Sequence, residues 1–203
     1  VWQIQKLLNP SLEQNVADGR KFPVYLKPEK KLTVEDMKTV LRNHYDGTAH
    51  DPYSPKLNGS EPWRPISVFR TYESHVMHVR PWMPKAVGEV TYVGFGMADL
   101  SCYVPFYQGL KAVPKNYGMG TDKADSQSAY WKYRKLQTLV MTDYQKLAPV
   151  VKTAYRDFEA KTAEAQKTME AKYLTENLTN ELFTIRTTDI QKDIFFANRK
   201  KKD

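Results

Sequence analysis

An arginine stands in the most strand-like stretch of this 203-residue sequence. Arg70 lies between Phe69 and Tyr72 in SVFRTYESHVMHVR, residues 67–80, which is rich in β-branched and aromatic side chains. A cation in a strand must reach solvent, pair with an acid or serve a pocket, because an unpaired buried charge is costly. The residues alone favour the structural alternatives over a pocket.

Cys102 is the single cysteine of the chain and therefore its only possible sulfur nucleophile. It falls inside a strand pattern, with no adjacent base and no helix N-terminus to lower its thiol pKa. We predict a buried structural thiol. One cysteine also excludes an internal disulfide and a multi-cysteine metal site, and a reducing compartment, the cytoplasm, is expected.

Two other patterns could do chemistry, and neither predicts a cofactor. His75 and His78 have a spacing that suits metal binding on a helix, but in a strand they point to opposite faces. GFGMAD, Gly94 to Asp99, lacks the third glycine and the following helix of a phosphate-binding loop, so we interpret it as a turn. We expect no metal and no cofactor.

The net charge of +8 raises the possibility of nucleic acid as a partner. The basic residues are scattered among acids, however, and the one dense run, Arg199 to Lys202, is typical of a solvated end. No stretch is apolar enough to span a bilayer. We therefore expect neither nucleic acid nor membrane as a partner.

The elements that position these residues follow from periodicity. Apolar residues at helical spacing predict a helix from Trp2, and a cap at Thr33 with Asp36 predicts another through His44, with a short extended piece over residues 22–26 between them. Strands are predicted at 67–80, 89–95 and 101–107. From Ser128 onward the chain is predicted to be helical, with Pro149 starting a second helix and a further segment beginning near Thr175.

These elements predict an α+β fold: an antiparallel sheet with covering helices. Residues 1–126 hold loops, a helix and the strands, and residues 127–203 are helical. Strand alternation places four polar side chains on one face of residues 67–80, a combination too polar for a sheet interior unless it lines a site: Arg70, Tyr72, Ser74 and His78.

Six longer segments of the sequence are distinctive: HYDGTAHDPYS (44–54), RPISVFRTYESHVMHVRP (64–81), CYVPFYQGL (102–110) and SAYWKYRKLQTLV (128–140), together with NPSLEQ (9–14) and KPEKKLTVEDM (27–37). These segments resemble the bacterial PepD-type cysteine dipeptidases. The likeness covers most of the chain, in order. It implies an N-terminal nucleophile hydrolase, with a four-layer αββα sandwich of which this chain is the C-terminal part.

The resemblance implies a mechanism in which a cysteine at the processed N-terminus attacks the amide carbonyl and its own α-amino group acts as the base. This sequence begins with Val1, so we expect the nucleophile in a missing N-terminal half. RTYESHVMHV also resembles the Arg-Thr-x-Tyr-Thr-x-Val strand of penicillin acylase and bile-salt hydrolase relatives, although the tyrosine here is one position nearer the arginine. This likeness implies that Arg70 is the active-site arginine.

The expected function is dipeptide hydrolysis by the intact protein, with Arg70 catalytic and Tyr72, Ser74 and His78 binding substrate. The chain alone is expected to be inactive, to have the N-terminal half as its partner, and to form a homo-oligomer through an uncovered apolar sheet face. The alternative is a basic, helix-rich binding or structural module without catalysis.

Overall fold

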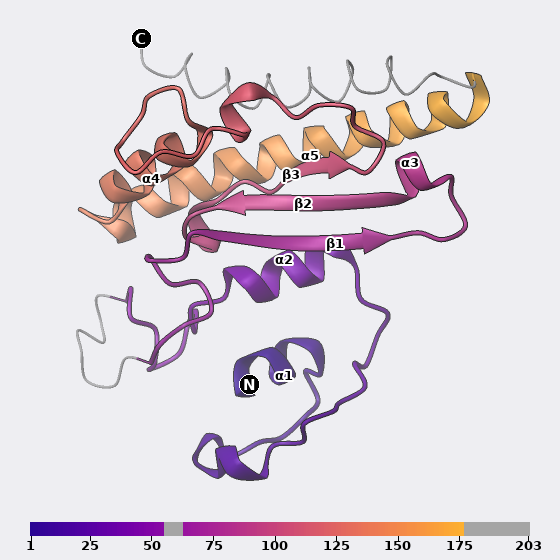
Figure 1. Cartoon of the computed structure of the whole chain (residues 1–203). Coiled ribbons are helices and arrows are strands. Elements are labelled where there is room, and N and C mark those ends of the chain that lie inside the picture. The colour runs from indigo at the N-terminus through magenta and orange to yellow at the C-terminus, as the bar shows by residue number, and fades with distance from the viewer. Residues whose placement is uncertain (55–62, 177–203) are drawn as a thin grey trace. The chain divides into compact units, whose positions relative to one another are not determined.

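The computed structural model describes residues 1–54 and 63–176 of the chain (Figure 1). The chain divides into two compact units, Val1–Val68 (unit 1) and Phe69–Asp203 (unit 2). All strands of the described residues belong to unit 2. That unit therefore carries the predicted site, and unit 1 is described separately.

Unit 1 contains α1 (Trp2–Leu8), the 3-10 helix η1 (Val16–Lys21) and α2 (Val34–Arg42). The predicted cap of α2 is confirmed: Thr33 Oγ1 accepts the Asp36 amide at 3.1 Å, and Asp36 Oδ2 accepts the Thr33 amide at 2.8 Å. The predicted extended piece at 22–26 is wrong, since these residues form bends with no partner strand. Pro23 cannot donate to a ladder.

The sheet of unit 2 has three antiparallel strands in the order β1-β2-β3 (Figure 1). They are β1 (Glu73–Val79), β2 (Glu89–Phe95) and β3 (Val104–Tyr107). Glu73 pairs with Phe95, the last residue of β2. Gly96 has a φ of 75°, and its amide donates to Tyr72 O at 2.7 Å as the chain enters the turn. Residues 67–72 therefore have no neighbouring strand, and the prediction that β1 begins at Ser67 is wrong.

The helices of unit 2 are α3 (Lys85–Gly88), the 3-10 turns η2 (Ala98–Leu100) and η3 (Lys115–Tyr117), α4 (Ala129–Val140) and α5 (Tyr144–Glu176). Pro149 does not start α5, contrary to prediction. It lies inside the helix, near its N-terminal end, where a proline removes a single backbone hydrogen bond. Residues 177–203, which include most of the predicted last segment, lie outside the described residues.

The faces of the sheet alternate as the sequence predicts from Glu73 onward. Ser74, Val76 and His78 are half-buried, whereas the residues between them are exposed. Val90 and Tyr107 continue the half-buried face and pack with Met169 of α5. The opposite side of β1 carries Met77 and Val79, which are 69% and 63% exposed.

A buried glutamine of α4 fixes the turn that follows β2. The Gln137 side chain is fully buried; its Oε1 accepts the Met97 amide at 3.1 Å, and its Nε2 donates to Phe95 O at 2.9 Å and Leu100 O at 3.2 Å. A Cβ on Gly96 would lie 2.1 Å from Gln137 Oε1, so a side chain at this position would collide with the glutamine.

The predicted α+β class with an antiparallel sheet is confirmed by the three strands and the helices of unit 2.

Candidate functional site

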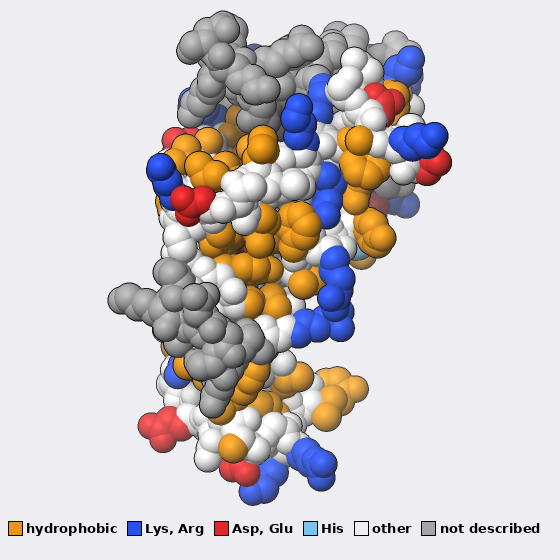
Figure 2. Space-filling model, turned by 90° about the vertical axis from the view of Figure 1, so that its left-hand side faces the viewer, with side chains coloured by type: hydrophobic (Ala, Val, Ile, Leu, Met, Phe, Trp, Pro, Cys, Tyr) orange, Lys and Arg blue, Asp and Glu red, His pale blue; other side chains and the backbone are white. Residues whose placement is uncertain are grey.

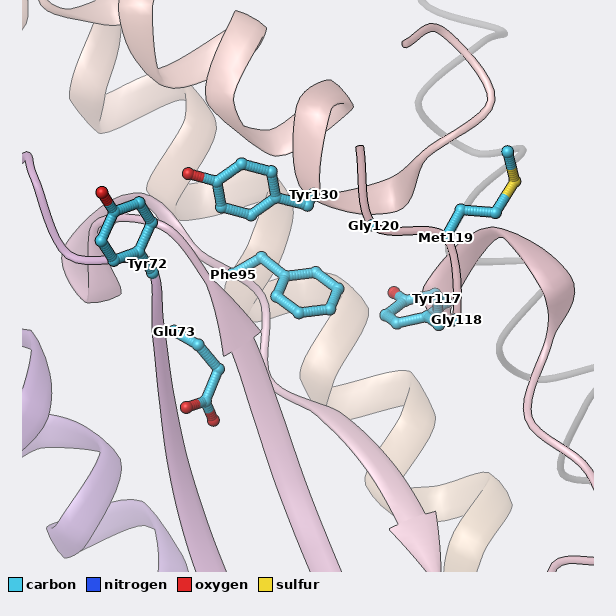
Figure 3. Close-up of a pocket in the computed structure, with 8 residues that line it drawn as sticks. All are labelled: Tyr72, Glu73, Phe95, Tyr117, Gly118, Met119, Gly120 and Tyr130. Atoms are coloured by element: carbon cyan, nitrogen blue, oxygen red, sulfur yellow. The ribbon is translucent and has the colours of Figure 1, made fainter. Parts of the chain in front are cut away.

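A hollow with a volume of about 300 Å³ opens where β1 begins and β2 ends (Figure 3). Viewed from this end of the sheet, hydrophobic side chains gather on the surface of unit 2, with Lys and Arg side chains beside them (Figure 2). Eight residues line the hollow: Tyr72, Glu73, Phe95, Tyr117, Gly118, Met119, Gly120 and Tyr130. Glu73 and Phe95 lie in the sheet, and Tyr72 directly precedes β1. Tyr117 ends η3, the next three residues form the loop after it, and Tyr130 lies in the first turn of α4.

The aromatic rings of the hollow form a continuous series from Tyr72 to Tyr117 (Figure 3). Ring centroids lie 6.4 Å apart for Tyr72 and Tyr130, 6.1 Å for Phe95 and Tyr130, and 5.5 Å for Phe95 and Tyr117. These distances are typical of aromatic pairs that stabilise one another. Phe95 and Tyr117 also pack against the buried cluster around Val104, so this wall belongs to the core.

Glu73 is the one charged residue among the eight that line the hollow. In Figure 3 its carboxylate points along the sheet, away from the Tyr72 and Tyr130 rings, and its Oε1 is 2.8 Å from His75 Nδ1. The Glu73 side chain is 39% exposed. The hollow thus combines apolar walls with a negative charge that water and a ligand can both reach.

Arg70 and Tyr72, two of the predicted site residues, precede β1. Arg70 lies in a turn and is exposed. Tyr72 is 77% exposed and lines the hollow. The neighbouring Phe69 contacts α4, because the Arg134 guanidinium of that helix lies 4.3 Å from the centre of the Phe69 ring.

Ser74 and His78, the other two predicted site residues, lie on the half-buried face of β1. Ser74 Oγ is 2.8 Å from the hydroxyl of buried Tyr103, and the Tyr103 amide donates to Glu159 of α5 at 2.6 Å. The structure therefore does not bring Ser74 and His78 to the hollow that Tyr72 lines. A substrate-binding role for them stays a prediction.

A polar network that sequence reasoning missed joins the end of β1 to α5. The Arg80 guanidinium binds both carboxylate oxygens of Glu170, at 2.8 and 2.7 Å. The Tyr107 hydroxyl donates to Glu170 at 2.6 Å, and Gln166 Nε2 donates to Tyr107 at 2.8 Å. No spacing in the sequence relates Arg80 to Glu170, so only the fold could reveal this pair.

His78 lies beside this network, and it gives a testable pH dependence. Burial, and then the positive charge of Arg80, lower the pKa of His78 below its ordinary value of 6.5, against an opposing effect of Glu170. As the pH falls below 6.5, His78 is therefore protonated in the unfolded chain before it is protonated in the folded protein. The free energy of unfolding should fall as the pH falls. Above pH 6.5 this contribution to stability is fully present.

We expect His78→Gln to flatten the loss of stability between pH 6.5 and pH 5, as measured by urea unfolding at each pH. His75→Gln, on the exposed face of the same strand, is the matched control. Equal changes of slope in both variants would contradict the explanation.

Cys102 is 1% exposed, which agrees with the prediction of a structural thiol. It packs in a cluster with Tyr133 and Tyr155. Burial raises the pKa of both tyrosines far above their ordinary value, so they remain neutral and cannot serve as bases toward the thiol.

In unit 1 a buried histidine, His44, contacts two carboxylates that sequence reasoning did not single out. Its Nδ1 is 2.9 Å from Asp51 Oδ1, and its Nε2 is 2.9 Å from Asp46 Oδ1. Nearby in this unit, His50 stacks on Trp63 with ring centroids 3.5 Å apart. Within residues 1–54 and 63–176, no group of His, Cys, Asp and Glu side chains could hold a metal ion.

Comparison with known proteins assigns the chain to a family of hydrolases. Residues 1–157 match peptidase family C69. The chain is 51% identical to a probable dipeptidase of Salmonella dublin over 123 residues, 61% of this chain and 27% of that protein. It is 32% identical to probable dipeptidase A of Streptococcus pyogenes serotype M3 (strain SSI-1) over 148 residues, 71% of this chain and 31% of that protein.

A probable dipeptidase of Latilactobacillus sakei is 34% identical over 148 residues, 71% of this chain and 30% of that protein. The chain thus belongs to peptidase family C69, the PepD-type dipeptidases. It spans less than a third of the length of these curated relatives. Among the described residues, no helix has the length and apolarity needed to cross a membrane.

Proposed function

We propose that this chain is the C-terminal part of a cysteine-type dipeptidase of the N-terminal nucleophile class, which hydrolyses the amide bond of dipeptides. The family match over residues 1–157 carries the proposal, because relatives of this family are named dipeptidases. The cytoplasm is the proposed compartment, since a single, buried cysteine suits a reducing environment.

The proposed nucleophile is an N-terminal cysteine in a part of the protein that lies outside this chain. Its thiolate would attack the substrate carbonyl, and its own α-amino group would take the thiol proton and return it to the leaving amine. We propose that Arg70 acts from this chain, either by stabilising the thiolate or by binding the substrate carboxylate. Its exposure leaves the guanidinium accessible to both groups.

The uncovered side of β1 supports the N-terminal half as the partner. Met77 and Val79 are more than half exposed on a strand whose opposite side is half-buried. Two-layer packing buries such a face against another element. We propose that the second sheet of an αββα sandwich covers it in the complete protein, and that copies of this chain alone associate through it.

We expect this chain alone to hydrolyse no dipeptide, and the complete protein to hydrolyse dipeptides with thiol dependence. The measurement is release of free amino acids by each preparation, with and without a thiol alkylating agent. Cys102→Ser should leave the complete enzyme active, because the Cys102 thiol is buried among neutral tyrosines. Thiol-dependent turnover by the chain alone, lost in Cys102→Ser, would overturn the assignment of the nucleophile.

A further inference from the structure

We propose that the hollow between β1, β2 and α4 is the subsite for the N-terminal residue of the substrate, and that it selects a large apolar side chain beside a free amino group. This inference rests on the proposed dipeptidase function and adds the substrate class. Four rings and one carboxylate carry it.

The walls of the hollow are suited to an apolar side chain. Tyr72, Phe95, Tyr117 and Tyr130 supply its aromatic surface, and the glycines of the adjoining loop, Gly118 and Gly120, leave it open. Its volume of about 300 Å³ is at the lower end of the range of roughly 300–1,000 Å³ that small-molecule pockets have. That is sufficient for an aromatic side chain together with its backbone amino group, and burial of apolar surface there would favour binding.

The charge of the hollow distinguishes the two ends of a dipeptide. Glu73 attracts the ammonium group of the N-terminal residue and repels the carboxylate of the C-terminal residue. The substrate ammonium would either bind the Glu73 carboxylate together with His75 or displace His75 from it. The N-terminal residue is thus the one that the hollow accepts.

The position of the hollow fits the proposed role of Arg70. Tyr72, on the wall, lies two positions after Arg70 in the sequence, so both residues belong to the segment that leads into β1. With the ammonium at Glu73, the remaining charge of a dipeptide is its carboxylate, which complements a guanidinium. Glu73 and Arg70 would then fix opposite ends of the substrate.

The test measures binding separately from catalysis in the complete protein, by calorimetric titration with L-phenylalaninamide and with N-acetyl-L-phenylalaninamide. Both probes carry the aromatic side chain, but only the first has an ammonium group. Glu73→Gln should weaken binding of L-phenylalaninamide about fivefold, as expected for a solvent-exposed ion pair, and leave the acetylated probe unchanged. Tyr72→Ala should weaken both probes by about threefold to tenfold.

Two variants provide matched controls: Glu164→Gln, an exposed glutamate of α5, and Tyr25→Ala, a tyrosine that is 93% exposed in unit 1. Neither should change the affinity of either probe. Equal weakening of both probes by Glu73→Gln, or no effect of Tyr72→Ala, would overturn the subsite.

Kinetics then separate the subsite from the proposed function. Hydrolysis of phenylalanyl-glycine in preference to glycyl-glycine, with the preference reduced in Tyr72→Ala, is the expected result. Equal hydrolysis of the two dipeptides would refute the subsite and leave the dipeptidase function standing. Failure to hydrolyse any dipeptide would refute the function, and the two titrations would still decide whether the hollow binds an aromatic ammonium.

Discussion

Replacement of Arg70 by lysine or by alanine is expected to lower kcat/KM of the complete enzyme by about a hundredfold or more, equivalent to about 2.7 kcal/mol of transition-state stabilisation. Lysine should fail although it keeps the charge, because a point cation does not reproduce the planar, bidentate donor of a guanidinium. Arg70 is exposed in a turn, so neither substitution should disturb folding.

Steady-state kinetics with a dipeptide substrate provide the measurement, with the free energy of unfolding determined in parallel. Arg64→Lys is the matched control, since Arg64 is also exposed and precedes the same strand. Near-normal kcat/KM in both Arg70 variants, with unchanged folding, would show that Arg70 has no part in the active site. That outcome would leave the family membership of the chain unaffected.

Replacement of Glu170 by leucine should lower the free energy of unfolding of unit 2 by about 3 kcal/mol. The Arg80 and Glu170 side chains are each 14% exposed, and the substitution leaves the guanidinium without its bidentate acceptor. The Tyr107 hydroxyl loses its acceptor as well. Urea unfolding followed by circular dichroism measures the loss.

A second variant separates the pair from simple packing. In Arg80→Met with Glu170→Leu no charge is left unpaired, so most of the lost stability should return. Glu164→Leu, on the exposed side of the same helix, should change the free energy of unfolding little. A double variant as unstable as Glu170→Leu alone would argue against the ion pair as the cause.

The fold was predictable wherever local pattern and tertiary pairing agree. The Thr33 cap, the presence of the three strands and the helices α1, α4 and α5 follow from periodicity and from cap and turn residues. The third strand begins at Val104 and not at the predicted Ser101, so Cys102 precedes it. The start of β1 did not follow, because the residues before Glu73 have strand-like side chains but no neighbouring strand beyond Phe95. The start of α5 was misplaced because proline is tolerated near a helix N-terminus and does not have to mark it.

The candidate site was predictable in part. Strand alternation correctly placed Ser74 and His78 on one face, but it could not show that this face is half-buried and away from the hollow. Tyr72 was singled out by the same alternation; it precedes β1 and lines the hollow, whereas Ser74 and His78 do not. Glu73 and Tyr130 were not found, since the hollow joins a strand to a helix more than fifty residues later, and no local pattern encodes that meeting.

The buried side chain of Gln137 has a consequence for ligand binding. Through its bonds to the turn after β2 it holds the Phe95 end of the strand to α4, and Tyr130 stands on that same helix. The separation of these two rings is thereby set by the folded core before any ligand arrives. A ligand that binds against these two rings would not lose binding energy to the ordering of that wall, so its affinity would depend on shape and charge.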